Sequence, residues 1–168
     1  VVSDGESVTI PFTTVNTGGT TTYTWTNTDP TTGLTTSGTS DIGFTAVNTG
    51  TSPITTTVVV TPGFENGGNS NTGPTDTFTI TVNPAAQIDP IDSMVVCNED
   101  NTTAVVFTTE NTGGTTTYSW TNDNTSIGLS SSGNGTIASF VVTNVTTSAQ
   151  VATIVVTPTF ENGGNSNA

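Results

Sequence analysis

Apolar and polar residues alternate along most of this chain, and the alternation has a period of two. Each alternating set predicts a strand with one buried and one exposed face. Clusters of Asn, Gly, Thr and Ser separate the sets at roughly the 8 to 12 residue spacing that is typical of a β-sandwich. No segment has a helical period, so the sequence predicts an all-β fold. The sets are Val8, Ile10 and Phe12; Tyr23 and Trp25; Ile42, Phe44 and Ala46; Phe78, Ile80 and Val82.

Two segments are apolar without alternation, one at residues 57–60 and one at residues 151–156. Continuous apolar runs of this length are typical of strands whose two faces are both covered. We therefore expect both segments to be central, buried strands.

The chain contains an internal repeat. Residues 12–27 return as residues 107–122 at a shift of 95, and residues 64–71 return as residues 160–167 at a shift of 96. The change of shift requires a one-residue insertion, which we place near Asn134, in a loop at 133–136 that matches 38–41. The sequence therefore predicts two tandem repeats, 1-84 and 85-168.

Each repeat lacks one end strand that the other has. Residues 88–96 have the pattern of a first strand with no counterpart before Val1, and residues 77–82 form a last strand with no counterpart after Ala168. We therefore expect further copies of the repeat in the same polypeptide, with strand exchange or lateral self-association between chains as alternatives.

The charge of the chain excludes several classes of function. It has no Lys, Arg or His and 13 acidic residues, so its formal net charge is −13. Nucleic acids and anionic membranes both require cationic side chains, and no apolar run is long enough to insert into a membrane. Without His or Lys, Ser-His-Asp catalysis and His-ligated zinc are also excluded. We expect no enzyme activity and no organic cofactor, and the single cysteine, Cys97, has no partner for an internal disulfide.

The aromatic residues have two interpretations. Trp25 and Trp120 alternate with Tyr23 and Tyr118, which favours a role in the core of each repeat. The alternative is a stacking platform for sugars.

Acidic residues near the junction of the repeats are candidate calcium ligands, because carboxylate oxygens from neighbouring loops suit that ion. The alternative is ordinary solvated surface charge. Ser93, within Asp92-Ser93-Met94, is a candidate O-glycosylation site. The calcium candidates are Asp89, Asp92, Glu99 and Asp100.

Several short motifs occur in an order that resembles a known family. They are Thr-Tyr-Thr-Trp-Thr-Asn at 22–27, Gly-Leu at 33–34, Val-Thr-Pro at 60–62 before an Asn-Gly-Gly loop, and Phe-Thr-Ile-Thr-Val-Asn-Pro at 78–84. Together they resemble the PKD-like, immunoglobulin-like repeats of secreted Bacteroidota proteins, which include giant surface adhesins such as the gliding adhesin of flavobacteria.

The resemblance implies tandem Ig-like β-sandwiches that act as spacers in an extracellular adhesin or filament. The alternative is a carbohydrate- or ligand-binding module attached to a secreted enzyme. Family members often carry a second Cys near the position of Asn71, and its absence leaves the family-type disulfide unsupported here.

Overall fold

The computed structural model describes residues 1–167 and divides the chain into two compact units. The first comprises Val1–Ala85 with Asn162–Ser166, and the second comprises Ala86–Glu161 with the chain from Asn167. Both units are all-β, as the alternation predicts, and no α-helix occurs in the described residues.

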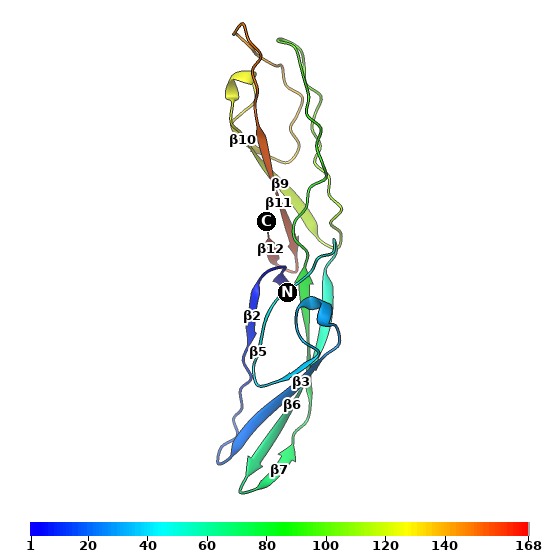
Figure 1. Cartoon of the computed structure of the whole chain (residues 1–168), viewed down its shortest axis with the longest axis vertical. Coiled ribbons are helices and arrows are strands. Elements are labelled where there is room, and N and C mark those ends of the chain that lie inside the picture. Colours follow the sequence, from blue (N-terminus) through cyan, green and yellow to red (C-terminus); the bar gives the residue numbers. More distant parts are fainter. Residues whose placement is uncertain (168) are drawn as a thin grey trace. The chain divides into compact units, whose positions relative to one another are not determined.

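The first unit contains two sheets (Figure 1). The larger has the order β1-β8-β6-β3-β4, and β7 pairs with the far end of β6. All of its pairings are antiparallel except that of β1 with β8. The smaller sheet pairs β2 with β5. The strands are β1 (Val2–Ser3), β2 (Ser7–Ile10), β3 (Thr20–Asn27), β4 (Ser37–Thr39), β5 (Ile42–Thr45), β6 (Ile54–Asn66), β7 (Asn69–Thr72) and β8 (Asp76–Asn83).

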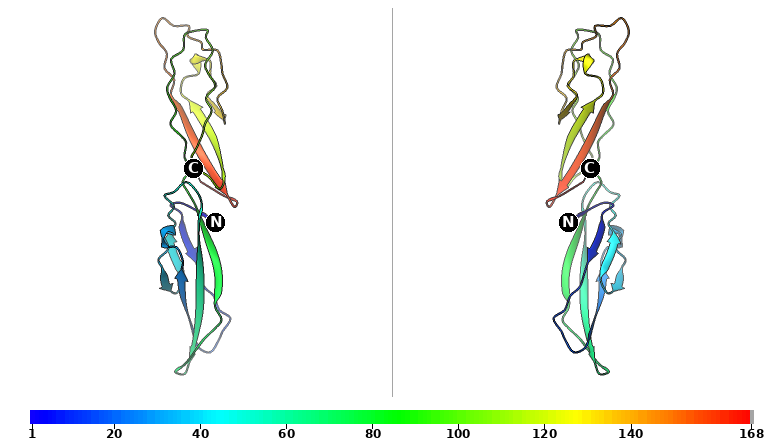
Figure 2. Two further views of the ribbon diagram at one scale, coloured as in Figure 1. Left: turned by 90° about the vertical axis from the view of Figure 1, so that its right-hand side faces the viewer. Right: turned by 90° about the vertical axis from the view of Figure 1, so that its left-hand side faces the viewer.

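The core of the first unit follows from the alternation. On β6 and β8, which lie side by side (Figure 2), Val58, Val60, Ile80 and Val82 point inward and are buried. The residues that flank them along the two strands are mostly threonines, whose β-branched side chains suit a pleated strand while the hydroxyl meets water. Trp25, Leu34, Ile42 and Ala46 complete the buried cluster.

A single 3₁₀ turn follows the Trp-bearing strand in both units. In the first unit, η1 (Pro30–Thr32) begins at the cap Asp29 and ends at Gly33, whose φ is 90°. A Cβ at Gly33 would lie 2.3 Å from the carbonyl oxygen of Thr45, so both the positive φ and the close approach require glycine. The second unit repeats this turn with Gly128 at φ 95°.

The third sheet has four strands in the order β10-β9-β11-β12, and the second unit contains β10, β9 and β11 as far as Glu161. Elsewhere in its described part only two isolated bridges form, Asn101 with Val141 and Val105 with Ile137. The core consists of Phe107, Trp120, Leu129 and Ile137. The elements of this part of the chain are β9 (Thr115–Asn122), η2 (Thr125–Ile127), β10 (Ser132–Asn134), β11 (Ile154–Asn162) and β12 (Asn165–Asn167). Asn162 of β11 and Asn165–Ser166 of β12 are grouped with the first unit.

Two predictions about the second unit are wrong. Residues 88–96 form no strand, and Figure 1 draws this segment without arrows. The apolar run at 151–156 is not a buried central strand, because Val151 is 80% exposed and Val155 is 58% exposed. In the first unit the matching run is covered because β8 pairs with it, and no described strand of the second unit does the same.

The insertion lies further along the chain than predicted. Ser40 and Gly135 both donate their backbone N–H to the carbonyl of the tyrosine in the preceding strand, so the shift is still 95 at this turn. The shift has become 96 where Val47 and Thr143 donate to η1 and η2. The extra residue therefore falls between 135 and 143, in the segment where the β2–β5 ladder of the first unit is reduced to isolated bridges in the second.

Candidate functional site

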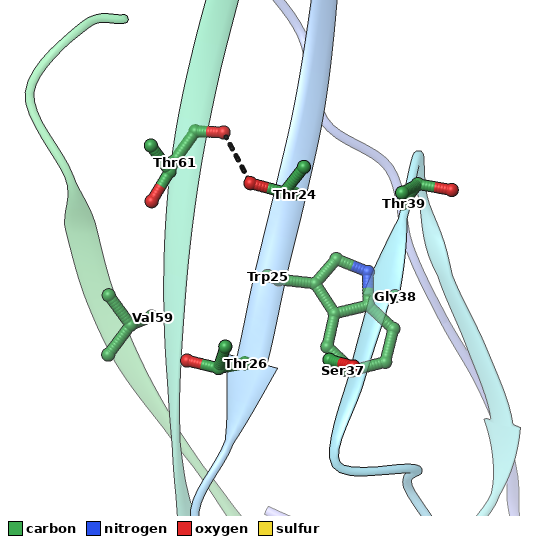
Figure 3. A pocket seen from close by; sticks show the side chains of 8 residues that line it. All are labelled: Thr24, Trp25, Thr26, Ser37, Gly38, Thr39, Val59 and Thr61. Carbon is green, nitrogen blue, oxygen red and sulfur yellow. Dashed lines mark hydrogen bonds between the residues drawn. The ribbon is translucent and has the colours of Figure 1, made fainter.

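One hollow in the first unit lies over the strands β4, β3 and β6 (Figure 3). Its lining combines five hydroxyl side chains with the side chains of Trp25 and Val59, and it contains no ionisable group. Such a surface can exchange hydrogen bonds with water or a polar ligand, but it holds no acid or base for catalysis. The lining residues are Thr24, Trp25, Thr26, Ser37, Gly38, Thr39, Val59 and Thr61.

Trp25 belongs to the core rather than to an exposed platform. Its indole extends over β4 at Gly38 (Figure 3), and only 6% of the residue is exposed. Trp120 packs over Gly133 in the same way and is 7% exposed. Stacking on a sugar requires an exposed ring face, which neither tryptophan offers. Within residues 1–167 the two indole N–H groups have no hydrogen-bond partner.

The two tyrosines lie beside the tryptophans and are partly buried against the two cores. Tyr23 packs on Phe12 with ring centroids 5.3 Å apart, and Tyr118 packs on Phe107 at 5.4 Å. Burial raises the pKa of Tyr118 above its ordinary value, the charge of Asp89 adds to this, and a hydrogen bond with Thr109 opposes it. The four aromatic residues predicted for the core are thus core residues or pack against it.

A buried asparagine organises the turn after each tryptophan, and sequence reasoning missed this role. Asn27 donates from Nδ2 to the carbonyl oxygens of Leu34 at 2.8 Å and Asp29 at 3.1 Å, and its Oδ1 accepts from the Thr56 hydroxyl. Asn122 donates in the same way to Leu129. The signal was available, because Trp-Thr-Asn recurs in both repeats.

Asp29 caps η1 through its side chain. Its Oδ1 accepts from the Thr31 hydroxyl at 2.6 Å and from the Thr31 backbone N–H at 2.9 Å. These hydrogen bonds favour the ionised form and hold the pKa of Asp29 below its ordinary value, although slight burial opposes them. The second unit carries Asn124 at this position, where its Oδ1 accepts from the hydroxyl of Ser126 at 2.6 Å.

The acidic residues predicted as calcium ligands occupy different local environments. Asp89 accepts a hydrogen bond from the Thr108 hydroxyl at 2.6 Å. Glu99 and Asp100 lie in a turn next to Val142, with Glu99 at φ 72°. Asp92 is exposed on the segment between them. Among the described residues, no three His, Cys, Asp or Glu side chains are grouped so that they could hold a metal ion, and calcium binding stays a prediction.

Ser93 and Cys97 are both exposed. Exposure makes Ser93 accessible to a glycosyltransferase, and the modification itself stays a prediction.

Comparison of the chain with protein-family models, with curated protein sequences and with solved structures gave no match. None of the helices in residues 1–167 is long and apolar enough to cross a membrane.

Proposed function

We propose that this chain is part of the stalk of a bacterial surface adhesin or extracellular filament, in which tandem Ig-like, PKD-like β-sandwich repeats act as spacers. Its function is to carry mechanical load, and it performs no chemistry. Charge and composition support this proposal, since a chain with no Lys, Arg or His offers few groups for catalysis and none for phosphate binding.

The observation that carries the proposal is the parallel pairing of the first and last strands of the first unit. Val2 pairs with Val82 and Ser3 with Asn83, and Asp4 N–H donates to the carbonyl of Asn83 at 2.9 Å. Tension applied to the two ends of residues 1–85 pulls parallel neighbours in opposite directions along their length. The hydrogen bonds between them are then loaded together rather than one after another.

Asn48 reinforces this pair of strands. The residue is 2% exposed, its backbone N–H donates to Asp4 Oδ1 at 2.7 Å, and its Nδ2 donates to the carbonyl of Val82 at 2.8 Å. Asn48 thus links the residue after β1, through its backbone N–H, to the end of β8, through its side chain. This arrangement is suited to a domain that must resist extension.

Single-molecule stretching of the chain by its two ends tests the proposal. The first unit should open at a distinct rupture force and release roughly 280 Å of contour length. Asn48→Ala should lower that force, whereas Asn71→Ala, which changes an exposed residue on β7, should not. Opening of the first unit without a measurable force would overturn the proposal.

The alternative of a carbohydrate-binding module has less support, because both tryptophans are buried in their cores. Binding of soluble or insoluble polysaccharides by the full chain, abolished by substitutions on the exposed threonines of the hollow over β3, would favour that alternative instead.

A further inference from the structure

The second unit contains four tripeptides of the form Asn-x-Ser/Thr, which is the acceptor motif for N-linked glycans. All four meet the motif in sequence, so the sequence alone does not rank them. The structure places them in different surroundings, and those surroundings decide which asparagine a glycosyltransferase can reach on the folded chain. The four tripeptides begin at Asn101, Asn124, Asn134 and Asn144.

Asn124 and Asn144 are half-buried, and their side chains are already bonded within their own loops. Asn124 donates from Nδ2 to the carbonyl of Val151 at 2.9 Å, and Asn144 donates from Nδ2 to the carbonyl of Ser148 at 2.9 Å. In each tripeptide the hydroxyl of the third residue also donates to the Oδ1 of the asparagine, at 2.6 Å and 2.8 Å. The acceptor nitrogen and the hydroxyl are therefore both engaged until the turn opens.

The tripeptide that begins at Asn101 is held to the second unit by its middle residue. Thr102 is 6% exposed. Its backbone N–H donates to the carbonyl of Phe140 at 2.9 Å, and its Oγ1 accepts from the Phe140 N–H at 3.1 Å. The tripeptide cannot leave the surface to enter a transferase without losing both hydrogen bonds.

Asn134 is exposed and is the last residue of the edge strand β10. Within residues 1–167, neither its side-chain amide nor the hydroxyl of the exposed Thr136 makes a hydrogen bond. Gly135, between them, has a φ of 63°, and a Cβ built there would have no atom within 4 Å. The Gly135 N–H donates to the carbonyl of Tyr118 at 2.8 Å, which fixes the turn. This tripeptide is thus presented on an ordered turn with open space around it.

The side chain of Asn134 points away from the core. Gly133, its neighbour on β10, lies against the indole of Trp120, and successive residues of a strand face opposite sides. Asn134 is paired with Ser119 of β9, and the next outward residue of that strand is Thr121. Both are exposed hydroxyl residues, with which a sugar at Asn134 can exchange hydrogen bonds.

We propose that Asn134 is the attachment site of an N-linked glycan, whose donor is an oligosaccharide carried on a lipid diphosphate. In the transfer, Nδ2 of Asn134 forms a bond to the anomeric carbon of the donor sugar and gives up one proton. The bond from that carbon to the diphosphate oxygen breaks, and the lipid diphosphate leaves. The inference goes beyond the proposed spacer function, because a glycan at the end of β10 also prevents this edge strand from pairing with a strand of another chain.

In vitro transfer to the purified, folded chain tests the proposal. The chain is incubated with a single-subunit oligosaccharyltransferase and a lipid-linked oligosaccharide, and chymotryptic peptides are analysed by mass spectrometry. Because transfer at Asn134 requires no local opening, its occupancy should exceed that of each other tripeptide by about tenfold or more. No transfer to the folded chain, or equal occupancy at the four positions, would overturn the proposal.

Short peptides are the matched control for the intrinsic preference of the enzyme. They are unfolded, so all four should accept the oligosaccharide at similar rates, and the ratio of chain to peptide then isolates the effect of the fold. A preference for Asn134 that is equally large among the peptides would show that its sequence, and not its exposure, is responsible, and would overturn the structural argument. The peptides comprise residues 98–104, 121–127, 131–137 and 141–147.

Two variants confirm the position. Asn134→Gln removes the acceptor and Thr136→Ala removes the hydroxyl of the motif, so each should abolish the glycan on the folded chain. Asn144→Gln should leave it in place. Retention of the glycan in Asn134→Gln would overturn the assignment. The proposed spacer function is tested separately, because the stretching measurement reports on β1 and β8 of the first unit.

Discussion

Gly38 lies so close to Trp25 that a side chain at position 38 would overlap the indole ring. It pairs with Trp25 across β4 and β3, and the indole lies directly over it. A Cβ added at Gly38 would lie 2.3 Å from Cζ2 of Trp25 and 2.7 Å from Cε2. Since carbon atoms in contact are ordinarily about 3.5 Å apart or more, Gly38→Ala must displace the ring by roughly 1 Å.

The ring has little space to move into, because Trp25 is 6% exposed and packs within the cluster that contains Leu34 and Val60. Overpacking of this kind costs about 1–3 kcal/mol. With an m-value of about 2 kcal/mol/M, the urea midpoint of the first unit should fall by roughly 1 M. Gly43→Ala is the matched control in β5, since nothing lies within 4 Å of its new Cβ. It should change stability by less than about 1 kcal/mol.

Urea denaturation followed by circular dichroism measures both variants. A double-mutant cycle with Trp25→Leu isolates the contact, because alanine at position 38 should cost less once the ring is gone. A coupling energy near zero, or an equal loss of stability in Gly43→Ala, would refute the account of this contact.

Three further predictions concern the turn and the charge of the chain. Asn27→Ala should destabilise the first unit by about 2–3 kcal/mol, because the buried carbonyl of Leu34 loses its donor; the exposed Thr26→Ala is the control in the same urea titration, and equal effects would contradict the prediction. Asp29 has a lowered pKa in the folded state, so the stability it contributes is complete above the unfolded value of about 3.9 and is lost as the pH falls through the folded value. The parent chain should therefore have a higher urea midpoint than Asp29→Asn at pH 6, and this difference should shrink as the pH falls to 2. Asn124→Ala, which alters the matching cap of the second unit, should lower the urea midpoint of that unit equally at both pH values. Trypsin should leave the chain intact even in urea that unfolds it, because no Lys or Arg is present, and tryptic fragments on a gel would contradict this.

Much of the fold was accessible from local patterns. The period-two alternation gave strands at β2, β3, β5 and β8, because a strand with one buried face requires that alternation whatever it pairs with. The repeat gave the equivalence of the two tryptophans for a similar reason. Gly38 and Gly133 recur because the same ring needs the same room in both units.

The pairing of strands was decided by the tertiary structure. The apolar runs at 57–60 and 151–156 look alike in sequence, yet the first lies buried beside β8 and the second is largely exposed, because burial depends on which strands pair with each run. The tertiary structure also decided the roles of Asn27 and Asn48, because their side-chain amides donate to carbonyl oxygens on other segments of the chain. Local sequence therefore determined which residues of this protein are extended and which face inward, whereas only long-range pairing determined which edges are covered and which polar side chains hold them together.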